Sequence, residues 1–376
     1  MSFHDILKSY RWDDVGRDIL ACDADDVRRS LASRNPAPHD LMPLLSPAAE
    51  PFLEEMAQRA HRLTEQRFGR VINLFAPVYV SNECINSCVY CGFNRANPLS
   101  RLTLTPRQVA VEGRHLHDAG FRHVLLVSGE NPHVVTLEYL TWVVDLLRPL
   151  FSSISIEIYP LETEEYEELI DHGVDGLVLY QETYDEVRYP EFHPRGRKKD
   201  FRRRLETPER GGKAGFRRLG IGALLGLGDW RVEGFFLGLH ARYLLKTFWK
   251  SHVTVSFPRL KPAAGSFSPP HPVGDAQFVQ LLVALRLFLP DAGFTLSTRE
   301  PPHLRDHLIP LGVTSMSAGS STEPGGYTHA CDAGAQFEVA DERSPAEIAE
   351  LIRRKGYEPV WKDWDPAFLE REVVSR

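Results

Sequence analysis

Short apolar runs alternate with longer amphipathic stretches from residue 71 to residue 317. The runs have the length of strands and are rich in β-branched residues, whereas the stretches between them repeat apolar positions with the period of a helix. The runs that predict strands are Val71–Val80, His123–Val127, Ile154–Tyr159, Gly176–Tyr180, Arg218–Gly226, Val253–Phe257, Phe294–Ser297 and Val313–Ser317. The pattern therefore predicts eight strands separated by helices.

This alternation favours one α/β fold over another. Eight βα units over about 250 residues match a closed (β/α)8 barrel of the TIM type, whose active site lies at the carboxyl ends of its strands. The alternative is an open doubly wound sheet that binds a dinucleotide. Its G-x-G-x-x-G fingerprint fails, because Gly220 and Gly222 are followed by Gly226, one residue too far along. We therefore predict the barrel.

The segments that flank the repeat have patterns of their own. Residues 1–69 predict helices, with Ser46 as an N-cap and Gly69 as a C-terminal stop. Residues 320–376 include the aromatic stretch Val360–Trp364, which is of the kind that docks on a folded domain. We expect three parts, which are an N-terminal helical extension at 1–69, the barrel at 70–319 and a C-terminal segment at 320–376 packed on the barrel.

One segment inside the repeat breaks the pattern. Residues 188–218 are rich in Arg, Lys and Gly and contain three prolines, two of them at positions 190 and 194. Such an insertion either covers a site or is solvated. We predict that most of it is a solvated surface.

Composition narrows the class of protein. The chain is 43% hydrophobic and 25% charged with a net charge of −7, which is typical of a soluble globular protein and disfavours nucleic acid as the main partner. Residues 1–17 have no apolar core, so they predict no signal peptide. The longest apolar run, Phe278–Leu289, contains Gln280 and Arg286 and predicts no membrane span. We expect a cytoplasmic protein with no membrane partner.

Three of the five cysteines lie within eight residues, at the end of the first predicted strand. They are Cys84, Cys88 and Cys91, with the spacing C-x3-C-x2-C. Thiolates are the usual ligands of iron–sulfur clusters, and a four-iron cube normally takes four of them. Three thiolates leave one iron open to a small molecule, which indicates chemistry. Cys22 and Cys331 are scattered, and we interpret them as ordinary residues.

Other interpretations of this cluster fit less well. A structural zinc site needs a fourth Cys or His nearby, and the next histidine is His115 on a predicted helix. A disulfide with a spare thiol would suit a secreted protein. A non-catalytic iron–sulfur electron carrier stays open as the alternative outside the enzymes, although such carriers normally saturate the cluster with four protein ligands.

The barrel prediction also identifies the residues at the mouth, because polar residues just beyond each strand should form the site. These are Gly129 and Glu130 after the second strand, Glu157 on the third, Gln181 and Glu182 after the fourth, Arg299 after the seventh and Ser317 on the eighth. Carboxylates with an arginine suit a zwitterionic ligand, since a guanidinium clamps a carboxylate and carboxylates take an ammonium group. S-adenosylmethionine and a free amino acid are both such ligands.

Each of these charges also has a structural alternative. Glu130 could cap the following helix, and Glu182 could pair with the nearby arginines. Arg299 could pair with Glu300 or Asp306. Paired charges serve structure as well as function, so the joint position beyond strand ends is the stronger argument.

The C-x3-C-x2-C motif with the aromatic Tyr90 before its third cysteine resembles the signature of the radical S-adenosylmethionine (SAM) superfamily. The resemblance implies that Cys84, Cys88 and Cys91 hold a [4Fe–4S] cluster whose fourth iron chelates SAM, and that one electron releases a 5′-deoxyadenosyl radical. In the superfamily a Gly-Gly-Glu segment binds the amino group of SAM, and here Ser128 replaces its first glycine. The cofactor-binding residues assigned on this basis are Tyr90, Gly129, Glu130, Glu157 and Gln181, with the segment 220–226 near the ribose and adenine.

The resemblance extends over nearly the whole chain. Seven segments, in the right order, look like those of the 2-iminoacetate synthase family, the tyrosine lyases of thiamine thiazole synthesis. They are Cys84–Phe93, Val178–Tyr184, Arg204–Pro208, Ser256–Leu260, Leu296–Glu300, Pro324–Tyr327 and Val360–Trp364.

This second resemblance implies a reaction and its partners. The reaction is cleavage of the Cα–Cβ bond of L-tyrosine to 2-iminoacetate and p-cresol. The implied partners are thiazole synthase, which receives the imine, and an electron donor such as flavodoxin or ferredoxin. By geometry and analogy, Arg299 with Ser317 grips the substrate carboxylate, and Glu182 completes the candidate catalytic residues.

Two related enzymes are alternatives. The tyrosine lyase of iron-only hydrogenase maturation binds a second cluster through a cysteine-bearing C-terminal extension, whereas this chain has one cysteine after Cys91, namely Cys331. A tryptophan lyase is the other, and the residues alone do not separate tyrosine from tryptophan as the substrate.

Overall fold

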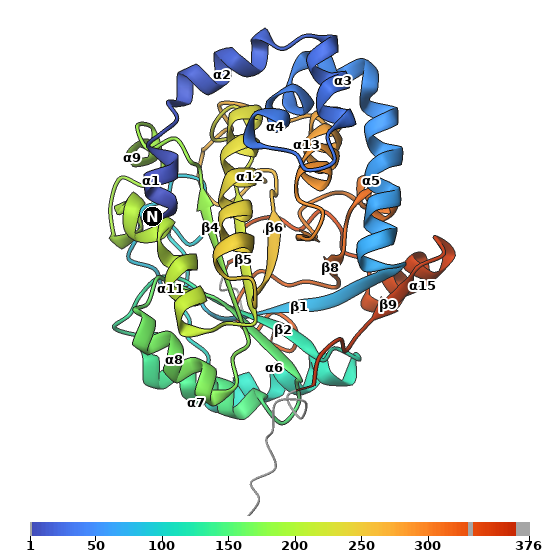
Figure 1. Ribbon diagram of the computed structural model, residues 1–376. Coiled ribbons are helices and arrows are strands. Elements are labelled where there is room, and N and C mark those ends of the chain that lie inside the picture. The colour runs from blue at the N-terminus through green and yellow to red at the C-terminus, as the bar shows by residue number, and fades with distance from the viewer. Residues whose placement is uncertain (1, 330–333, 366–376) are drawn as a thin grey trace, which may run out of the picture.

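The computed structural model describes residues 2–329 and 334–365. Its centre is a closed parallel barrel, in which each strand pairs with the next and β1 pairs with both β2 and β8 (Figure 1). The strands are β1 Val71–Ser81, β2 His123–Ser128, β3 Ser153–Glu157, β4 Gly176–Glu182, β5 Arg218–Ala223, β6 His252–Ser256, β7 Gly293–Leu296 and β8 Ser315–Ser317. All eight predicted strands and the predicted (β/α)8 barrel are confirmed, with boundaries shifted by a few residues.

Helices cover the outside of the barrel between successive strands. They are α6 Pro106–Asp118, α7 Leu137–Leu147, α8 Thr163–His172, α9 Tyr189–Phe192, α10 Phe201–Leu205, α11 Thr207–Ala214, α12 Trp230–Thr247, α13 Asp275–Phe288 and α14 Pro302–Leu308. Local sequence signals set their ends. For example, α6 begins with Pro106 at its first position, and α8 is followed at its C-cap by Gly173, whose φ of 115° suits glycine.

An N-terminal group of helices packs over α12 and α13 (Figure 1). It comprises α1 Phe3–Leu7, α2 Trp12–Ala21, α3 Ala24–Ala32, α4 Pro38–Leu45, a 3-10 turn Pro47–Phe52 and α5 Leu53–Phe68. Gly238 of α12 has no room for a Cβ, which would lie 2.6 Å from a methyl of Leu41. The close approach buries most of α12, so the helices predicted before residue 69 form a further layer.

The C-terminal segment returns to the bottom of the barrel. It carries α15 Pro345–Arg354 and a short strand β9 Glu358–Val360, which pairs with the start of β1. The ring of Trp361 packs edge-on against Phe121 at a centroid distance of 5.2 Å. The stretch Val360–Trp364 thus contacts the barrel through β9 and Trp361, whereas Cys331 lies outside the described residues. The division of the chain at residues 69 and 319 stays a prediction.

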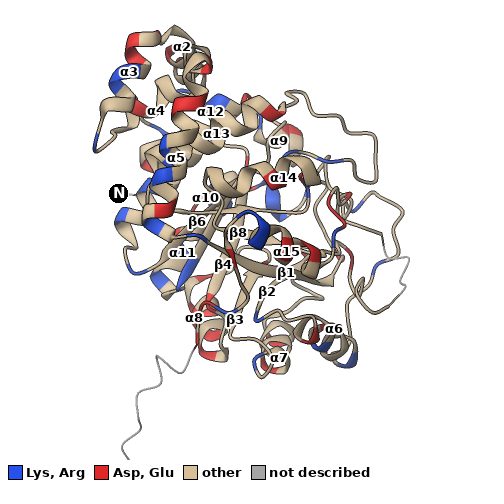
Figure 2. Ribbon diagram, turned by 90° about the vertical axis from the view of Figure 1, so that its right-hand side faces the viewer, with Lys and Arg blue, Asp and Glu red and all other residues tan. Residues whose placement is uncertain are grey.

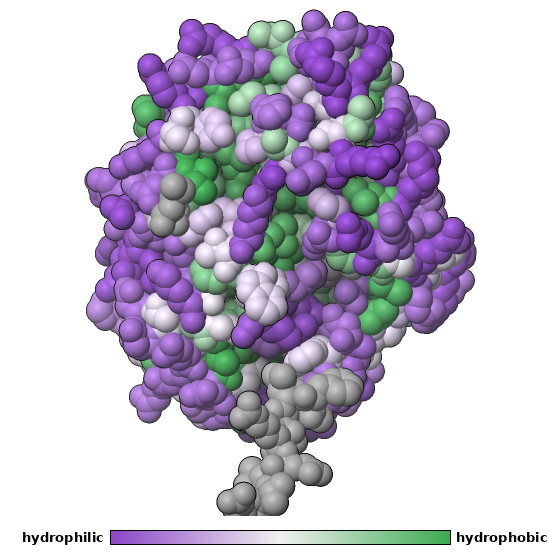
Figure 3. Space-filling view, viewed as in Figure 1, coloured by the Kyte–Doolittle hydropathy of each residue, from purple (hydrophilic) through white to green (hydrophobic). Residues whose placement is uncertain are grey.

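The outer surface is mostly polar. Figure 2 shows Lys and Arg interspersed with Asp and Glu over the outer helices. Figure 3 shows a largely hydrophilic face, because the apolar sides of these helices are turned toward the barrel. No helix within residues 2–329 and 334–365 combines the length and the apolar character needed to span a membrane.

Candidate active site

The loop after β1 presents the three cysteines to one cavity at the mouth of the barrel. Arg101 fixes the loop from behind, since its guanidinium donates to the carbonyls of Asn82 at 2.8 Å and Phe93 at 3.0 Å. The Asn97 amide donates to the carbonyl of Gly92 at 2.8 Å. The thiols of Cys84, Cys88 and Cys91 line a space of about 560 Å³ together with Glu130, Glu182 and Lys198.

These cysteines fit the thiolate ligands of a cluster. All three are free thiols, Cys88 is buried and the other two are partly buried. Burial raises the pKa of the Cys91 thiol to about 11, so cluster assembly has to displace protons. In a four-iron cluster each cysteine thiolate binds a different iron, so the three sulfurs do not have to converge on one point. The described residues contain no three His, Cys, Asp or Glu side chains placed to hold a single metal ion, which does not favour the zinc alternative.

The segment after β2 lies directly against this loop. Gly129 cannot carry a side chain, because a Cβ would lie 2.2 Å from the carbonyl oxygen of Glu83. The Glu130 carboxylate accepts from the Asn86 amide at 2.7 Å, whereas the N-cap of α7 is Thr136. The capping alternative for Glu130 is therefore wrong. Ser128 lines the same cavity with a buried hydroxyl that has no partner among the described groups, so it is free for a polar ligand.

Glu182 at the end of β4 has a strained backbone and two cationic partners. Its φ of 73° is the only positive value at a non-glycine residue in the described chain. The carboxylate accepts from Lys198 Nζ at 2.7 Å and from Arg204 Nη2 at 3.4 Å. Burial alone would raise the pKa of Glu182, but the two cations lower it below its usual value. The pairing alternative for Glu182 is confirmed.

This pairing corrects the prediction for residues 188–218. Arg195, Arg197 and Lys199 are exposed, as predicted for a solvated surface. The prediction that most of the segment is solvated is nevertheless wrong, because most of its residues are buried or half-buried. The side chains of Lys198 and Arg204 are only 14% and 9% exposed. Both line the cysteine cavity, because the short helices α9 and α10 fold this segment back over β4.

The structure does not bring Gln181 to the cavity, although it was predicted to bind the cofactor. Side chains alternate along a strand, so Tyr180 faces the interior while Gln181 faces outward toward α10. Its amide donates to the carbonyl of Phe201 at 3.5 Å. A register shift between Tyr180 and Glu182 then turns Glu182 back toward the mouth.

Tyr90 lies in the wall beside the cysteines rather than in their cavity. Its hydroxyl forms a 2.8 Å hydrogen bond with His193 Nε2, and Lys198 Nζ lies 5.7 Å from the centre of its ring. The ring faces a separate groove formed by residues 260–269. Its predicted contact with the cofactor stays a prediction.

A second cavity, of about 540 Å³, adjoins the first and contains Arg299 and Ser317. Arg299 forms no ion pair with any described carboxylate, because Glu300 pairs with Arg259 and Asp306 pairs with Arg343. The structural alternative for Arg299 is therefore wrong. Its guanidinium lies over the Phe337 ring at 3.4 Å, which leaves its N–H groups available to a ligand. Ser317 Oγ accepts from the Thr298 amide at 3.2 Å.

Glu157 lines both cavities and so lies between them. Burial, followed by the nearby Glu182, raises the pKa of Glu157 to about 7, against the pull of Arg299. The structure thus brings together Cys84, Cys88, Cys91, Gly129, Glu130, Glu157, Glu182, Arg299 and Ser317.

The raised pKa of Glu157 predicts a pH dependence of stability. A carboxyl whose folded pKa exceeds its unfolded value costs stability as it ionises, so the cluster-free chain should lose unfolding free energy as the pH rises from about 4.5 to about 7. We expect Glu157→Gln to lose less over this range, as measured by urea denaturation at each pH. Exposed Glu138→Gln on α7 is the control, and equal losses in both variants would contradict the assignment.

Comparison with known proteins agrees with this geometry. A closed barrel whose first strand ends in this three-cysteine loop defines a radical SAM enzyme, and the Radical SAM superfamily pattern matches residues 78–236. The Biotin and Thiamin Synthesis associated domain matches residues 256–358. The chain is 43% identical to the 2-iminoacetate synthase of Escherichia coli over 97% of both chains, and 43% identical to that of Salmonella typhimurium over 100% of both. It belongs to the 2-iminoacetate synthase family.

A solved structure supports the same class. The crystal structure of HydG, a maturase of the [FeFe]-hydrogenase, superposes with a TM-score of 0.87 at 31% identity, covering 95% of this chain and 83% of that one. The chain is therefore a radical SAM lyase, and membership of the superfamily implies a [4Fe–4S] cluster and SAM.

Proposed function

We propose that this chain cleaves the Cα–Cβ bond of L-tyrosine to 2-iminoacetate and p-cresol, with 5′-deoxyadenosine and methionine as the other products, for the thiazole part of thiamine. The observation that carries the proposal is Arg299, a cation without a described carboxylate partner in a cavity that adjoins the three cysteines. The relatives that bear the name 2-iminoacetate synthase match over the whole chain and support the same reaction.

The cofactor site is proposed to lie in the cysteine cavity. Cys84, Cys88 and Cys91 would hold the [4Fe–4S] cluster, which with bound SAM supplies the 5′-deoxyadenosyl radical. Glu130 would accept from the amino group of SAM, and the partnerless Ser128 hydroxyl offers a further polar contact. Lys198 and Arg204 would balance the carboxylates that surround the zwitterion.

The substrate site is proposed to lie in the Arg299 cavity. The guanidinium can take the amino-acid carboxylate with two parallel N–H bonds, and the Ser317 hydroxyl lies in the same wall. Tyr79 and Tyr180 offer aromatic surface to the ring of tyrosine. Glu157, between the two cavities, can accept from the substrate amino group when it is ionised.

The C-terminal segment helps to close this mouth. The Gly92 amide donates to the carbonyl of Gln336 at 2.9 Å, and the Tyr79 hydroxyl donates to the Gln336 side chain at 2.7 Å. A Cβ at Gly92 would lie 2.2 Å from the carbonyl of Ala335, so the segment lies directly on the cysteine loop. Such closure excludes water and stray hydrogen donors from radical chemistry.

Two protein partners belong to the proposal. An electron donor such as flavodoxin or ferredoxin would reduce the cluster, and thiazole synthase would receive the imine. Imines hydrolyse in water, so direct transfer of 2-iminoacetate to a partner enzyme would protect it.

An anaerobic assay tests the proposal. The reconstituted chain is incubated with dithionite, SAM and either L-tyrosine or L-tryptophan, and 5′-deoxyadenosine, p-cresol and glyoxylate are followed. We expect p-cresol and glyoxylate to rise with deoxyadenosine only in the presence of tyrosine. Deoxyadenosine without p-cresol would contradict tyrosine as the substrate. Glyoxylate formed with tryptophan but not with tyrosine would favour the tryptophan lyase.

A further inference from the structure

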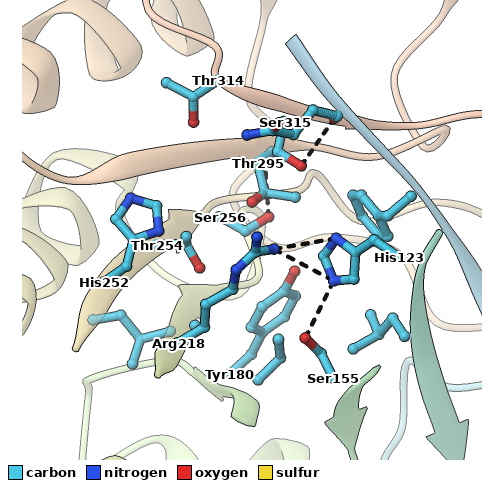
Figure 4. Close-up of a pocket in the computed structure, with 16 residues that line it drawn as sticks. His123, Ser155, Tyr180, Arg218, His252, Thr254, Ser256, Thr295, Thr314 and Ser315 are labelled. Atoms are coloured by element: carbon cyan, nitrogen blue, oxygen red, sulfur yellow. Dashed lines mark hydrogen bonds between the residues drawn. The ribbon is translucent and has the colours of Figure 1, made fainter. Parts of the chain in front are cut away.

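The barrel encloses a third cavity beneath the substrate site (Figure 4). It lies among the inward-facing residues of the strands. None of the three cysteines or Arg299 lines it. The cavity is therefore distinct from the two that form the proposed active site.

The sequence explains why this space is open. The interior of a (β/α)8 barrel is normally filled by bulky branched side chains in layers. Here the inward positions on neighbouring strands are small or hydroxylated, namely Ser155, Gly220, Thr254, Thr295 and Ser315. These side chains leave a polar hollow where a typical barrel has a packed core.

The lining is rich in hydrogen-bond donors and contains no Asp or Glu. Figure 4 shows Arg218 reaching into the hollow between His123 and Thr254. Arg218 Nη1 donates to His123 Nδ1 at 3.1 Å, so the neutral imidazole keeps its proton on Nε2, near Ser155 Oγ at 3.2 Å. Arg218 Nε is buried and has no partner among the described groups. An unused guanidinium donor in a carboxylate-free hollow suits an anion.

The same arginine already binds a carboxylate on its other side. Its Nη2 donates to Asp363 of the C-terminal segment. The Arg218 side chain is 12% exposed, so the guanidinium is largely buried in this ion pair. The contact shows that this guanidinium donates to a carboxylate, and its Nε–H has no described partner and so remains for another ligand.

The hollow is adjacent to the substrate cavity. Phe75, Leu125, Tyr180 and Thr295 line both spaces, so they form a shared wall. Of the two products that tyrosine itself would give, one is an uncharged phenol and the other is a two-carbon carboxylate. Only the carboxylate matches the donors around Arg218.

We propose that this interior hollow is a second binding site, which holds a small two-carbon carboxylate at Arg218. The identity of the physiological ligand as the imino acid rests on the proposed function. The site itself rests on the donor set of Arg218, Thr254 and Thr295 and on the absence of a lining carboxylate. Binding there keeps the product behind the substrate rather than at the open mouth.

Equilibrium dialysis with radiolabelled glycolate tests the site. Glycolate is a two-carbon carboxylate that has no aldehyde group, so it does not react with lysine side chains. The cluster-loaded chain is used with SAM but no reductant, so no turnover is needed. We expect saturable binding of one equivalent, weakened about tenfold or more in Arg218→Gln. The neighbouring Arg217→Gln is the matched control, because Arg217 pairs with Asp175 and does not line the hollow.

Further variants locate the ligand and guard against misfolding. Thr254→Val with Thr295→Val removes two hydroxyls at nearly constant shape, and it should weaken glycolate binding about threefold or more even if Arg218→Gln fails to fold. Arg299→Gln should change glycolate binding less than twofold. Absence of saturable binding, which would mean a water-filled hollow, or loss of binding in Arg299→Gln alone, would overturn the proposal. Glycolate binding in a chain that forms no p-cresol would contradict the proposed lyase activity but would still support the second binding site.

Discussion

Replacing Arg299 with glutamine is expected to lower kcat/KM for L-tyrosine by about 10²- to 10³-fold, because truncating one partner of a buried, hydrogen-bonded charge pair costs about 2–5 kcal/mol. Arg299 is the natural partner of the substrate carboxylate because the described chain gives it none of its own. The measurement is p-cresol formation against tyrosine concentration in the anaerobic assay. Release of 5′-deoxyadenosine without substrate should change little, since Arg299 does not line the cysteine cavity.

Two further variants serve as controls for the Arg299→Gln result. Arg299→Lys keeps the charge but loses the planar fork, so its kcat/KM should fall between those of the wild type and the glutamine variant. Arg353→Gln on α15, where the side chain is 52% exposed, is a control that should behave as the wild type. Unchanged kcat/KM in Arg299→Gln would remove Arg299 from the substrate site.

The sequence was sufficient to predict the barrel and most of its mouth. Buried parallel strands leave continuous apolar runs, as in His123–Ser128 of β2, where five of six residues are buried. Once eight such runs are assigned, the residues beyond their ends must converge. This is why Glu130, Glu182 and Arg299, which are far apart in the sequence, were predicted at one site.

The orientations of some side chains near the site could not be predicted from the hydrophobic pattern. Lys198 lies in a 3-10 turn, Arg197–Lys199, and Arg204 lies in the short helix α10. Nothing in the pattern shows that these two side chains turn inward while Lys199 faces solvent. The Arg204–Pro208 segment did carry a family resemblance, which was the one available hint. Gln181 was misplaced because alternation along β4 turns it outward, and the register shift before Glu182 cannot be seen in the sequence.

The hollow inside the barrel was missed for a related reason. The serines and threonines of β3, β6 and β7 are individually ordinary strand residues. Only the register between neighbouring strands brings them together, because Thr254 of β6 pairs with Gly220 of β5, and Thr295 of β7 pairs with Ser315 of β8. The pattern along each strand predicts which side chains point into the barrel. Which of these side chains meet inside the barrel depends on the register between neighbouring strands, and the sequence does not show that register.

Lys198→Met is expected to destabilise the cluster-free chain by about 3 kcal/mol, because removing one partner of a buried ion pair leaves an uncompensated charge. Glu182 is 10% exposed, and its remaining cation, Arg204, lies farther away at 3.4 Å. The midpoint of urea denaturation, followed by tryptophan fluorescence, measures the loss. Lys199→Met changes the adjacent, exposed lysine and should have little effect.

The pH dependence of the Lys198→Met defect identifies its cause as the Glu182 charge. Lys198 is one of the groups that lower the pKa of Glu182, so its removal raises that pKa. The defect should therefore be largest at pH 8 and shrink once the pH falls below the raised pKa of the variant, where its carboxyl becomes neutral. It should vanish only below the lowered wild-type pKa, where the carboxyl is neutral in both folded chains. Glu182→Gln combined with Lys198→Met should restore much of the stability. A defect that is equal at pH 5 and pH 8, and equal in the double variant, would mean that Lys198 stabilises the mouth by packing rather than through its ion pair with Glu182.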